Sequence, residues 1–262
     1  MLQNLKLPDI QRNASFNSDY SVYHMTKREY VLYGLEGSAI VALFGYFFYR
    51  SVIITLVFLP AVFPYILYKR KQLAKQRQWN LTLQFKELLQ SVNGSIQAGY
   101  SIENAFMNSV FDMISLFGKD SDIVNELLII SRGLNNGVPL IALLNTFSKR
   151  SANEDIRNFV NVLSIGNQTG GKIPDILNSY ISVIDDKVAL LMDINTITSS
   201  QRFEQKIMNS IPFFIIFYVD LTSRGFFNVL YHNAFGIIVM SICLMLYLLS
   251  IYLSQSIINI RI

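Results

Sequence analysis

Two long blocks of apolar residues lie toward the ends of the chain, and a more polar stretch with helical periodicity lies between them. The first block covers residues 30–68 and holds two apolar runs of about 18 residues, close to the length that crosses the hydrocarbon core of a bilayer. Arg50 and Ser51 form the only polar break between these runs. The pattern predicts a transmembrane helical hairpin with a very short turn.

The second block covers residues 207–254 and again holds two apolar runs, 207–219 and 234–254, with a more polar segment between them. The run at 207–219 is shorter than a full span, so we expect it to recruit residues from the segments on either side. The block predicts a second transmembrane hairpin, which is followed by a short cytoplasmic segment, residues 255–262.

Residues 69–206 carry much of the charge of the chain, and their apolar residues recur with the period of an α-helix. Between positions 81 and 98 the apolar residues fall on one helical face, and they are Leu81, Phe85, Leu88, Leu89, Val92 and Ile96. The same period returns in residues 156–163 and 176–191. We therefore predict an all-α membrane protein in which a cytoplasmic antiparallel helical bundle lies between two transmembrane hairpins.

Glycine, serine and proline divide this bundle into helices at three places. Gly99 can take the left-handed conformation that ends a helix, and Ser101 is a good N-cap for the next one. Gly137 can end another helix, and Pro139 suits the first turn of the helix that follows. The third place is the glycine-rich stretch 166–172. The turn residues that we expect to matter for structure are Gly99, Ser101, Gly137, Pro139, Gly166, Thr169, Gly170 and Gly171.

The stretch GNQTGGK at residues 166–172 matches the start of the phosphate-binding P-loop pattern. A P-loop needs a hydroxyl at the next position to hold Mg²⁺, and Ile173 stands there instead. A P-loop also follows a strand, whereas the residues on both sides of this stretch have helical period. We therefore expect a turn between two helices, in which Gly170 and Gly171 provide positive φ or close backbone approach. Lys172 should then be a solvated side chain.

Basic residues flank the apolar runs and predict which parts of the chain face the cytoplasm. They are Lys27, Arg28, Lys69, Arg70, Lys71, Lys75, Arg77, Arg202, Lys206 and Arg261. Because such clusters stay on the cytoplasmic side, we expect both termini and the bundle to be cytoplasmic. Composition agrees with a membrane protein, since only 15% of the residues are charged, against about 25% in soluble domains.

We expect residues 1–29 to form a flexible cytoplasmic tail without a cleaved signal peptide, because the first apolar run begins only after this polar segment. The net charge of +4 comes from basic residues beside apolar runs. It therefore indicates membrane topology and not nucleic-acid binding.

The chain offers little of the chemistry that active sites use. Its single cysteine, Cys243, lies in an apolar run, and His24 and His232 are far apart without neighbouring cysteines. We find no catalytic constellation or metal-ligand cluster, and therefore expect a non-enzymatic protein without a cofactor. Glu36, inside the first apolar run, is the candidate for a functional membrane acid, although its side chain could instead reach the interface.

Three motifs follow one another between the apolar blocks: AGYSIENA at 98–105, GVPL at 137–140 and GNQTGGKI at 166–173. Their order and the flanking hairpins resemble the type II secretion F domain family over roughly residues 30–254. A single domain copy between two hairpins is most similar to the Tad pilus branch of that family. The acidic residue common in the third motif is Asn167 here, so no family role of that carboxylate is carried over.

The resemblance implies a multi-pass platform protein in the plasma (inner) membrane of a prokaryote. Such a protein takes part in type II secretion or type IV pilus assembly. Its implied partners are a hexameric secretion ATPase, pilin or pseudopilin subunits, membrane lipid, and either a second copy or a second platform subunit. Nucleic acid is not an implied partner.

A small polytopic transporter or channel is the alternative interpretation. Glu36 and Asp220 would then be its working groups. Transporters often have paired broken spans, and an ion pathway needs acidic groups inside the bilayer. This chain places one acid well inside a span and puts much of its charge in the helical bundle.

Overall fold

The computed structural model describes residue 20 and residues 25–223 and 234–259. Within these ranges the chain is helical and has no strand. The all-α class is therefore confirmed for the described residues. The finer arrangement, a bundle between two membrane hairpins, stays a prediction.

The chain forms two compact units, and two long helices contribute residues to both. One unit, which we call the bundle, comprises Met1–His24 and Arg70–Asp186. The other, which we call the apolar unit, comprises Met25–Lys69 and Lys187–Ile262. The shared helices are α3 (Val62–Gln97) and α8 (Ile173–Thr222).

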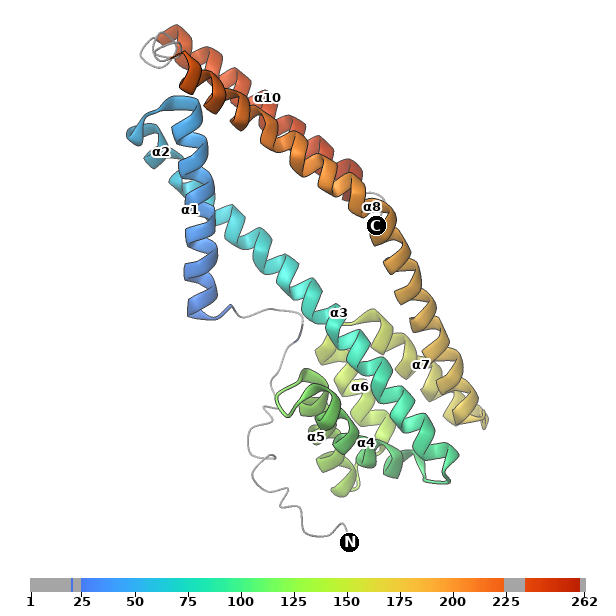
Figure 1. Cartoon of the computed structure of the whole chain (residues 1–262). Coiled ribbons are helices and arrows are strands. Elements are labelled where there is room, and N and C mark those ends of the chain that lie inside the picture. The colour runs from blue at the N-terminus through green and yellow to red at the C-terminus, as the bar shows by residue number, and fades with distance from the viewer. Residues whose placement is uncertain (1–19, 21–24, 224–233, 260–262) are drawn as a thin grey trace. The chain divides into compact units, whose positions relative to one another are not determined.

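In the bundle, four shorter helices pack with the adjoining parts of α3 and α8 (Figure 1). They are α4 (Ile102–Phe117), α5 (Asp122–Asn135), α6 (Leu140–Ser151) and α7 (Glu154–Thr169). The apolar face predicted for residues 81–98 is buried, except that Ile96 is only partly covered. The ring of Phe85 lies 6.1 Å from that of Phe147 and 5.3 Å from that of Phe159. Aromatic packing thus joins α3, α6 and α7 in one core.

A buried asparagine fixes the start of α7. The Oδ1 atom of Asn153 accepts hydrogen bonds from the backbone N–H groups of Asp155 (2.9 Å) and Ile156 (3.4 Å). Its amide nitrogen donates to Thr82 Oγ1 (2.8 Å) and to the carbonyl of Gln78 (3.1 Å). One side chain therefore caps α7 and also ties its first turn to α3.

The apolar unit contains α1 (Lys27–Tyr49), α2 (Val52–Phe58), the 3₁₀ turn η1 (Leu59–Ala61) and α10 (Ala234–Asn259), with parts of α3 and α8. Aromatic rings hold α1, α8 and α10 together. The ring of Phe213 on α8 packs edge-on against Phe44 (5.3 Å) and Phe47 (5.5 Å) of α1. It packs in the same manner against Tyr247 of α10 at 5.8 Å.

The second apolar run of the first block is not one uninterrupted helix. Helix α2 ends at Phe58, η1 covers Leu59–Ala61, and α3 begins at Val62. Pro60 lies in η1 and explains the break, because proline lacks an N–H donor and its ring clashes with the preceding helical turn.

Two helices of the apolar unit are long and apolar enough to cross a membrane, α1 and residues Phe235–Ile257 of α10. Only 17% of the most apolar window of each helix is buried within the protein. A core helix of a water-soluble protein would be mostly covered. The exposed apolar surfaces of these two helices are therefore expected to contact another apolar environment. The two helices support association with a membrane. The predicted spans at 51–68 and 207–219, and the orientation of the termini, stay predictions.

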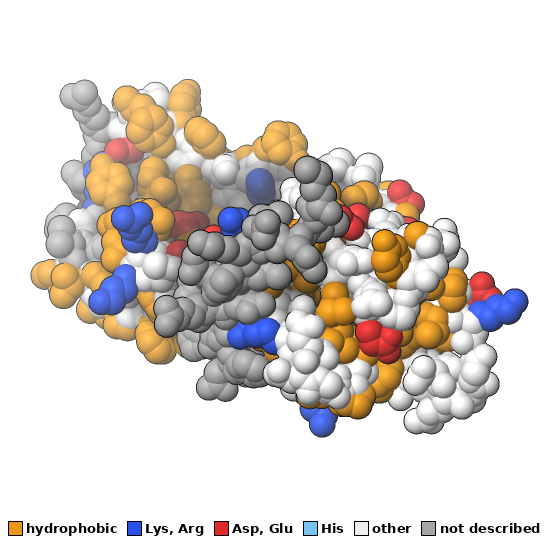
Figure 2. All heavy atoms as spheres, turned by 90° about the horizontal axis from the view of Figure 1, so that it is seen from below, with side chains coloured by type: hydrophobic (Ala, Val, Ile, Leu, Met, Phe, Trp, Pro, Cys, Tyr) orange, Lys and Arg blue, Asp and Glu red, His pale blue; other side chains and the backbone are white. Residues whose placement is uncertain are grey.

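Charged residues of the bundle lie singly or in ion pairs. On the face shown in Figure 2, basic and acidic side chains are scattered among hydrophobic and uncharged ones. The guanidinium of Arg77 makes two hydrogen bonds to the carboxylate of Asp122, at 2.7 and 2.8 Å. The ammonium of Lys86 lies 3.0 Å from a carboxylate oxygen of Asp185, and this hydrogen bond raises the pKa of Lys86. The positive charge of these residues is thus locally balanced.

Candidate functional site

The first turn motif joins α3 to α4 through a glycine in the left-handed region. Gly99 has a φ of 94°. The N–H of Tyr100 donates to the carbonyl of Ser95 at 3.2 Å, the long backbone bond that closes a helix of the Schellman type. Ser101 then begins α4 as its N-cap, and its hydroxyl oxygen accepts a hydrogen bond from the N–H of Asn104 at 3.3 Å. Both residues occupy the positions expected from the sequence.

The second turn motif joins α5 to α6 in the same way. Gly137 has a φ of 77°, and the N–H of Val138 donates to the carbonyl of Gly133 at 2.9 Å. Pro139 lies one residue earlier than expected, because it is the N-cap of α6 and Leu140 is the first helical residue. Its ψ of 137° is extended, so it leads into the helix without belonging to the first turn.

The third motif begins inside a helix. Helix α7 runs through Gly166 and ends only at Thr169, so the first four residues of GNQTGGK are helical. Gly170 then takes the left-handed conformation, with a φ of 72°, and α8 begins at Ile173. The hydroxyl of Thr169 donates to the carbonyl of Ile165 at 3.0 Å, within its own helix. The stretch therefore joins two helices and does not follow a strand.

Close packing explains the two remaining glycines of this motif. A methyl group at Gly166, which is buried within α7, would lie 2.2 Å from Cδ1 of Ile176 on α8. A methyl group at Gly171 would lie 3.3 Å from the carbonyl oxygen of Gly166. Positive φ is thus the requirement at Gly170, and close backbone approach is the requirement at Gly171. The side chain of Lys172 is exposed.

The three motifs meet around one pocket of about 130 Å³ in the bundle. Residues from all three line it, among them Ile102, Glu103, Pro139, Leu140, Asn167 and Ile173. Helices α4, α6 and α8 begin at this pocket and α7 ends there. The sequence identified the motifs singly but did not predict that they share a surface.

The lining of this pocket is partly apolar and partly polar. Its lining contains one carboxylate, Glu103, and one side-chain amide, Asn167, beside apolar residues. It includes no nucleophile next to a base. Across the described ranges, no group of three or more His, Cys, Asp or Glu residues could hold a metal ion. His24 and His232, for which the sequence predicted no metal site, lie outside those ranges.

Glu36, the candidate membrane acid, lies on α1 near a lysine of α3. One of its carboxylate oxygens is 3.7 Å from the ammonium of Lys69. That ammonium also lies over the rings of Tyr33 (5.4 Å) and Tyr65 (5.6 Å). Glu36 is therefore part of a charge and aromatic cluster that joins α1 to α3.

An ion pair that the sequence did not predict links the far end of α1 to α8. The guanidinium of Arg50, the C-cap of α1, contacts the carboxylate of Asp220. The same guanidinium lies 5.9 Å from the ring centre of Tyr46. Both residues belong to the apolar unit.

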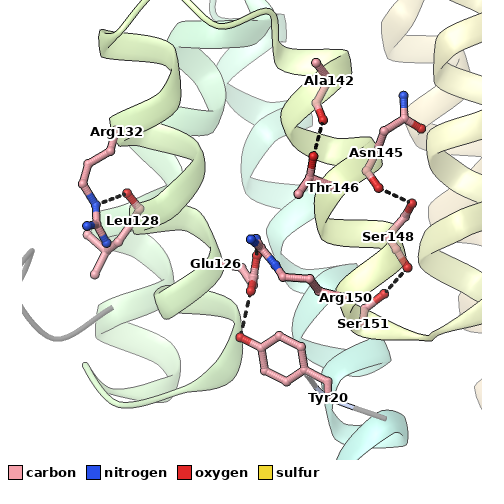
Figure 3. Close-up of polar contacts among 10 residues, drawn as sticks. All are labelled: Tyr20, Glu126, Leu128, Arg132, Ala142, Asn145, Thr146, Ser148, Arg150 and Ser151. Atoms are coloured by element: carbon pink, nitrogen blue, oxygen red, sulfur yellow. Dashed lines mark hydrogen bonds and ion pairs between the residues drawn. The ribbon is translucent and has the colours of Figure 1, made fainter. Parts of the chain in front are cut away.

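The N-terminal tail contains a residue of the bundle core. Tyr20, which lies in the segment 1–29 expected to form a flexible cytoplasmic tail, is 1% exposed, and residues 1–19 and 21–24 of that segment lie outside the described residues. Its hydroxyl donates to Oε1 of the fully buried Glu126 at 2.9 Å, and Glu126 also pairs with Arg150 at 2.5 Å (Figure 3). The sequence did not predict this contact, because the aromatic residues of this polar segment have no helical or strand periodicity. The aromatic cluster DYSVY at 19–23 was the available signal.

No protein-family model, curated protein or solved structure matches the chain. The resemblance of its three motifs to the secretion F domain therefore stays a hypothesis based on the residues themselves.

Proposed function

We propose that the chain is a non-enzymatic platform protein of a type II secretion or Tad pilus machine, of the TadB type. In this proposal the bundle faces the cytoplasm and contacts a hexameric secretion ATPase. The apolar unit lies in the plasma membrane and passes pilin or pseudopilin subunits to the growing fibre. Either a second copy or a second platform subunit completes the assembly.

The observation that supports this proposal most is the shared surface of the three turn motifs. Motifs separated by as many as 60 residues of chain converge on one pocket, although each has its own local structural role. A surface formed by four helix ends presents polar backbone groups and the carboxylate of Glu103. It is a suitable place for a protein partner to bind.

Helix α8 supplies a physical connection between such a surface and the membrane. It begins at the third motif and continues without interruption from Ile173 to Thr222, through the predicted span at 207–219. A continuous helix transmits axial displacement better than a flexible linker, so a partner at its start could act on its other end. This coupling is part of the proposal.

The transporter alternative receives no support from the two acids on which it depends. Glu36 lies beside Lys69, and Asp220 pairs with Arg50. Carboxylates that carry ions or protons are expected to face a water-filled pathway. We therefore retain the platform interpretation.

Binding to the ATPase tests the proposal. The full chain in nanodiscs should bind the purified hexameric secretion ATPase of the same organism. Glu103→Ala, at the pocket, should weaken binding by about fivefold, the effect of one exposed charge contact. Asp120→Ala is the matched control, because Asp120 is an exposed carboxylate between α4 and α5 outside the pocket lining. Absence of binding by the wild-type chain would refute the proposed partner.

A further inference from the structure

The apolar unit contains a cavity of about 220 Å³. Helices α1, α2, α3 and α10 and the turn η1 all contribute residues to its lining, which is apolar and aromatic and includes Phe44, Phe58 and Leu244. An apolar cavity of roughly 150 Å³ in another protein stays dry and binds benzene. The cavity described here therefore has room for a chain of several methylene groups.

Two glycines of α1 shape this cavity, and both line it. A methyl group at Gly37 would lie 3.0 Å from Cγ1 of Val62 on α3, and a methyl group at Gly45 would overlap the side chain of Thr55 on α2. The two glycines thus allow α1 to approach α2 and α3 closely, and they add no side chain to the cavity.

The cavity is elongated along α1. Its lining on this helix runs from Gly37 to Tyr49, a rise of about 18 Å. The rings of Tyr49 and Phe58, 6.2 Å apart, line the end near the turn between α1 and α2. Tyr65 of α3 lines the other end, next to Gly37. The length is close to half of a hydrocarbon core of about 30 Å, which is the depth of one leaflet of a bilayer.

Positive charge lies next to the Tyr65 end of the cavity. Lys69 follows Tyr65 by one turn of α3, and its ammonium lies 5.6 Å from the centre of the Tyr65 ring. A lysine ammonium has three N–H donors, so it can bind a phosphate oxygen while it lies 3.7 Å from Glu36. Arg70 and Lys71 follow in the sequence, so three positive charges stand against one carboxylate. Basic clusters at the end of an apolar segment attract anionic phospholipids.

We propose that this cavity binds one anionic phospholipid, with one acyl chain between α1, α3 and α10 and with the phosphate at Lys69. The apolar lining and its length fit the acyl chain, and the cation fits the headgroup. The inference rests on the membrane association of the apolar unit and not on the secretion partners. Failure of the ATPase to bind would leave the lipid site standing, and failure of the lipid to bind would leave the proposed partners standing.

Photo-crosslinking of the full chain in phosphatidylcholine nanodiscs tests the site. The probe is phosphatidylglycerol with a diazirine in one acyl chain, added below saturation, and mass spectrometry maps where it attaches. Attachment should concentrate on cavity residues such as Val41 and Leu244, and not on exposed positions such as Leu246. Val41→Phe fills part of the cavity, so it should lower this attachment about tenfold, the effect of displacing roughly two methylene groups. Lys69→Gln should lower it about fivefold, the effect of one cation at a membrane surface.

Matched variants separate a specific site from general contact with lipid. Val31→Phe makes the same change at an exposed position of α1 outside the lining, and Lys27→Gln removes an exposed cation at the start of α1. Both should leave attachment in the cavity unchanged. Ala61→Leu fills the cavity from η1 and should act like Val41→Phe, and circular dichroism reports whether both variants fold. Equal attachment to cavity residues in the wild type and in both filling variants, or attachment spread evenly over the exposed faces of α1 and α10, would overturn the site.

Discussion

Single residues of the glycine-rich turn have separate physical tasks. Gly170 supplies a backbone conformation that L-residues with a Cβ rarely adopt. Gly171 allows the chain to pass close to the carbonyl of Gly166. A methyl group added at Gly171 would lie 3.3 Å from that carbonyl oxygen. Lys172 is exposed and follows both. A phosphate site would depend most on the lysine, whereas a turn depends on the glycines.

Substitutions in this turn should therefore rank in a definite order. Gly170→Val should destabilise the bundle by about 1–2 kcal/mol, because a β-branched residue fits a positive φ badly. Gly171→Val should also destabilise it, through the contact with Gly166. Lys172→Ala should leave stability nearly unchanged. Chemical unfolding followed by circular dichroism measures the order. Saturable ATP binding that is lost in Lys172→Ala would instead show a nucleotide site.

The burial of Glu126 predicts how the stability of the bundle should change with pH. Burial raises the pKa of its carboxyl, while Arg150 and the Tyr20 hydroxyl act in the opposite direction. The folded state thus binds this proton more tightly than the unfolded chain, so the stability from this group is full below the ordinary glutamate pKa. It is lost as the pH rises through the raised pKa.

Comparison with Glu126→Gln isolates this group, because the variant has no titrating carboxyl at position 126. Near pH 4 the two proteins should have similar stability, because the folded wild type is then protonated at Glu126 and, like the variant, has no anion beside Arg150. As the pH rises to 7, the wild type should become less stable relative to Glu126→Gln. Thermal unfolding of both full-length proteins across this range measures the difference, and a wild type that gains stability over the variant as the pH rises would show that the sign is wrong.

At the scale of elements, capping and proline determine where helices begin and end. Asn153 caps α7 from a buried position and also bonds to α3, whereas Ser101 caps α4 with one exposed hydrogen bond. Pro60 interrupts the apolar segment between α2 and α3. Helix α8, in contrast, contains Pro212 and remains one helix. Local sequence therefore sets most helix boundaries, and packing decides which caps contribute most to stability.

The two caps should differ in their contribution to stability. Asn153→Ala should lower the free energy of unfolding by about 2 kcal/mol, because it removes a cap and the hydrogen bonds that the Asn153 amide donates to Thr82 and to the carbonyl of Gln78. Ser101→Ala should cost about 0.5 kcal/mol, since water can replace its exposed bond. Urea unfolding of the full chain in detergent compares them. Equal losses would show that the contacts of Asn153 with α3 contribute nothing.

Much of the helical content was predictable, because periodicity and turn chemistry are local properties. The buried face from Leu81 to Val92, the glycines at the helix ends and the Ser101 cap all follow from neighbouring residues. We did not predict the shared pocket, although every second turn of a bundle of antiparallel helices lies at the same end of the bundle. The contacts of Tyr20 with Glu126, and of Arg50 with Asp220, join residues more than 100 positions apart and leave no periodic trace.

At the scale of the whole molecule, the chain combines a bundle, whose core resembles that of a water-soluble protein, with an apolar unit. The bundle has buried phenylalanines and paired charges. In the apolar unit, α1 and α10 present exposed leucine, isoleucine and aromatic side chains, which supports association with a membrane. From the basic residues that flank the two predicted hairpins, we predict a topology in which the bundle is inside the cell and the Arg50 and Asp220 ends are outside.

Cysteine labelling in a Cys243→Ser background tests this topology. Asp120→Cys, in the exposed turn between α4 and α5, should react with a membrane-impermeant maleimide only after the cells are permeabilised. Ser223→Cys, an exposed position after α8, should react in intact cells. Labelling of Asp120→Cys in intact cells would place the bundle outside and contradict the predicted orientation.

The most direct measurement of the proposed function is pilus assembly in a strain that lacks this gene. We expect that no fibres form while prepilin accumulates in the membrane, and that the wild-type gene and Lys172→Ala both restore assembly. Electron microscopy counts the fibres, and membrane fractionation locates the prepilin. Normal fibres in the deletion strain, with no second gene of this kind to substitute, would show that the chain is not the platform of the machine.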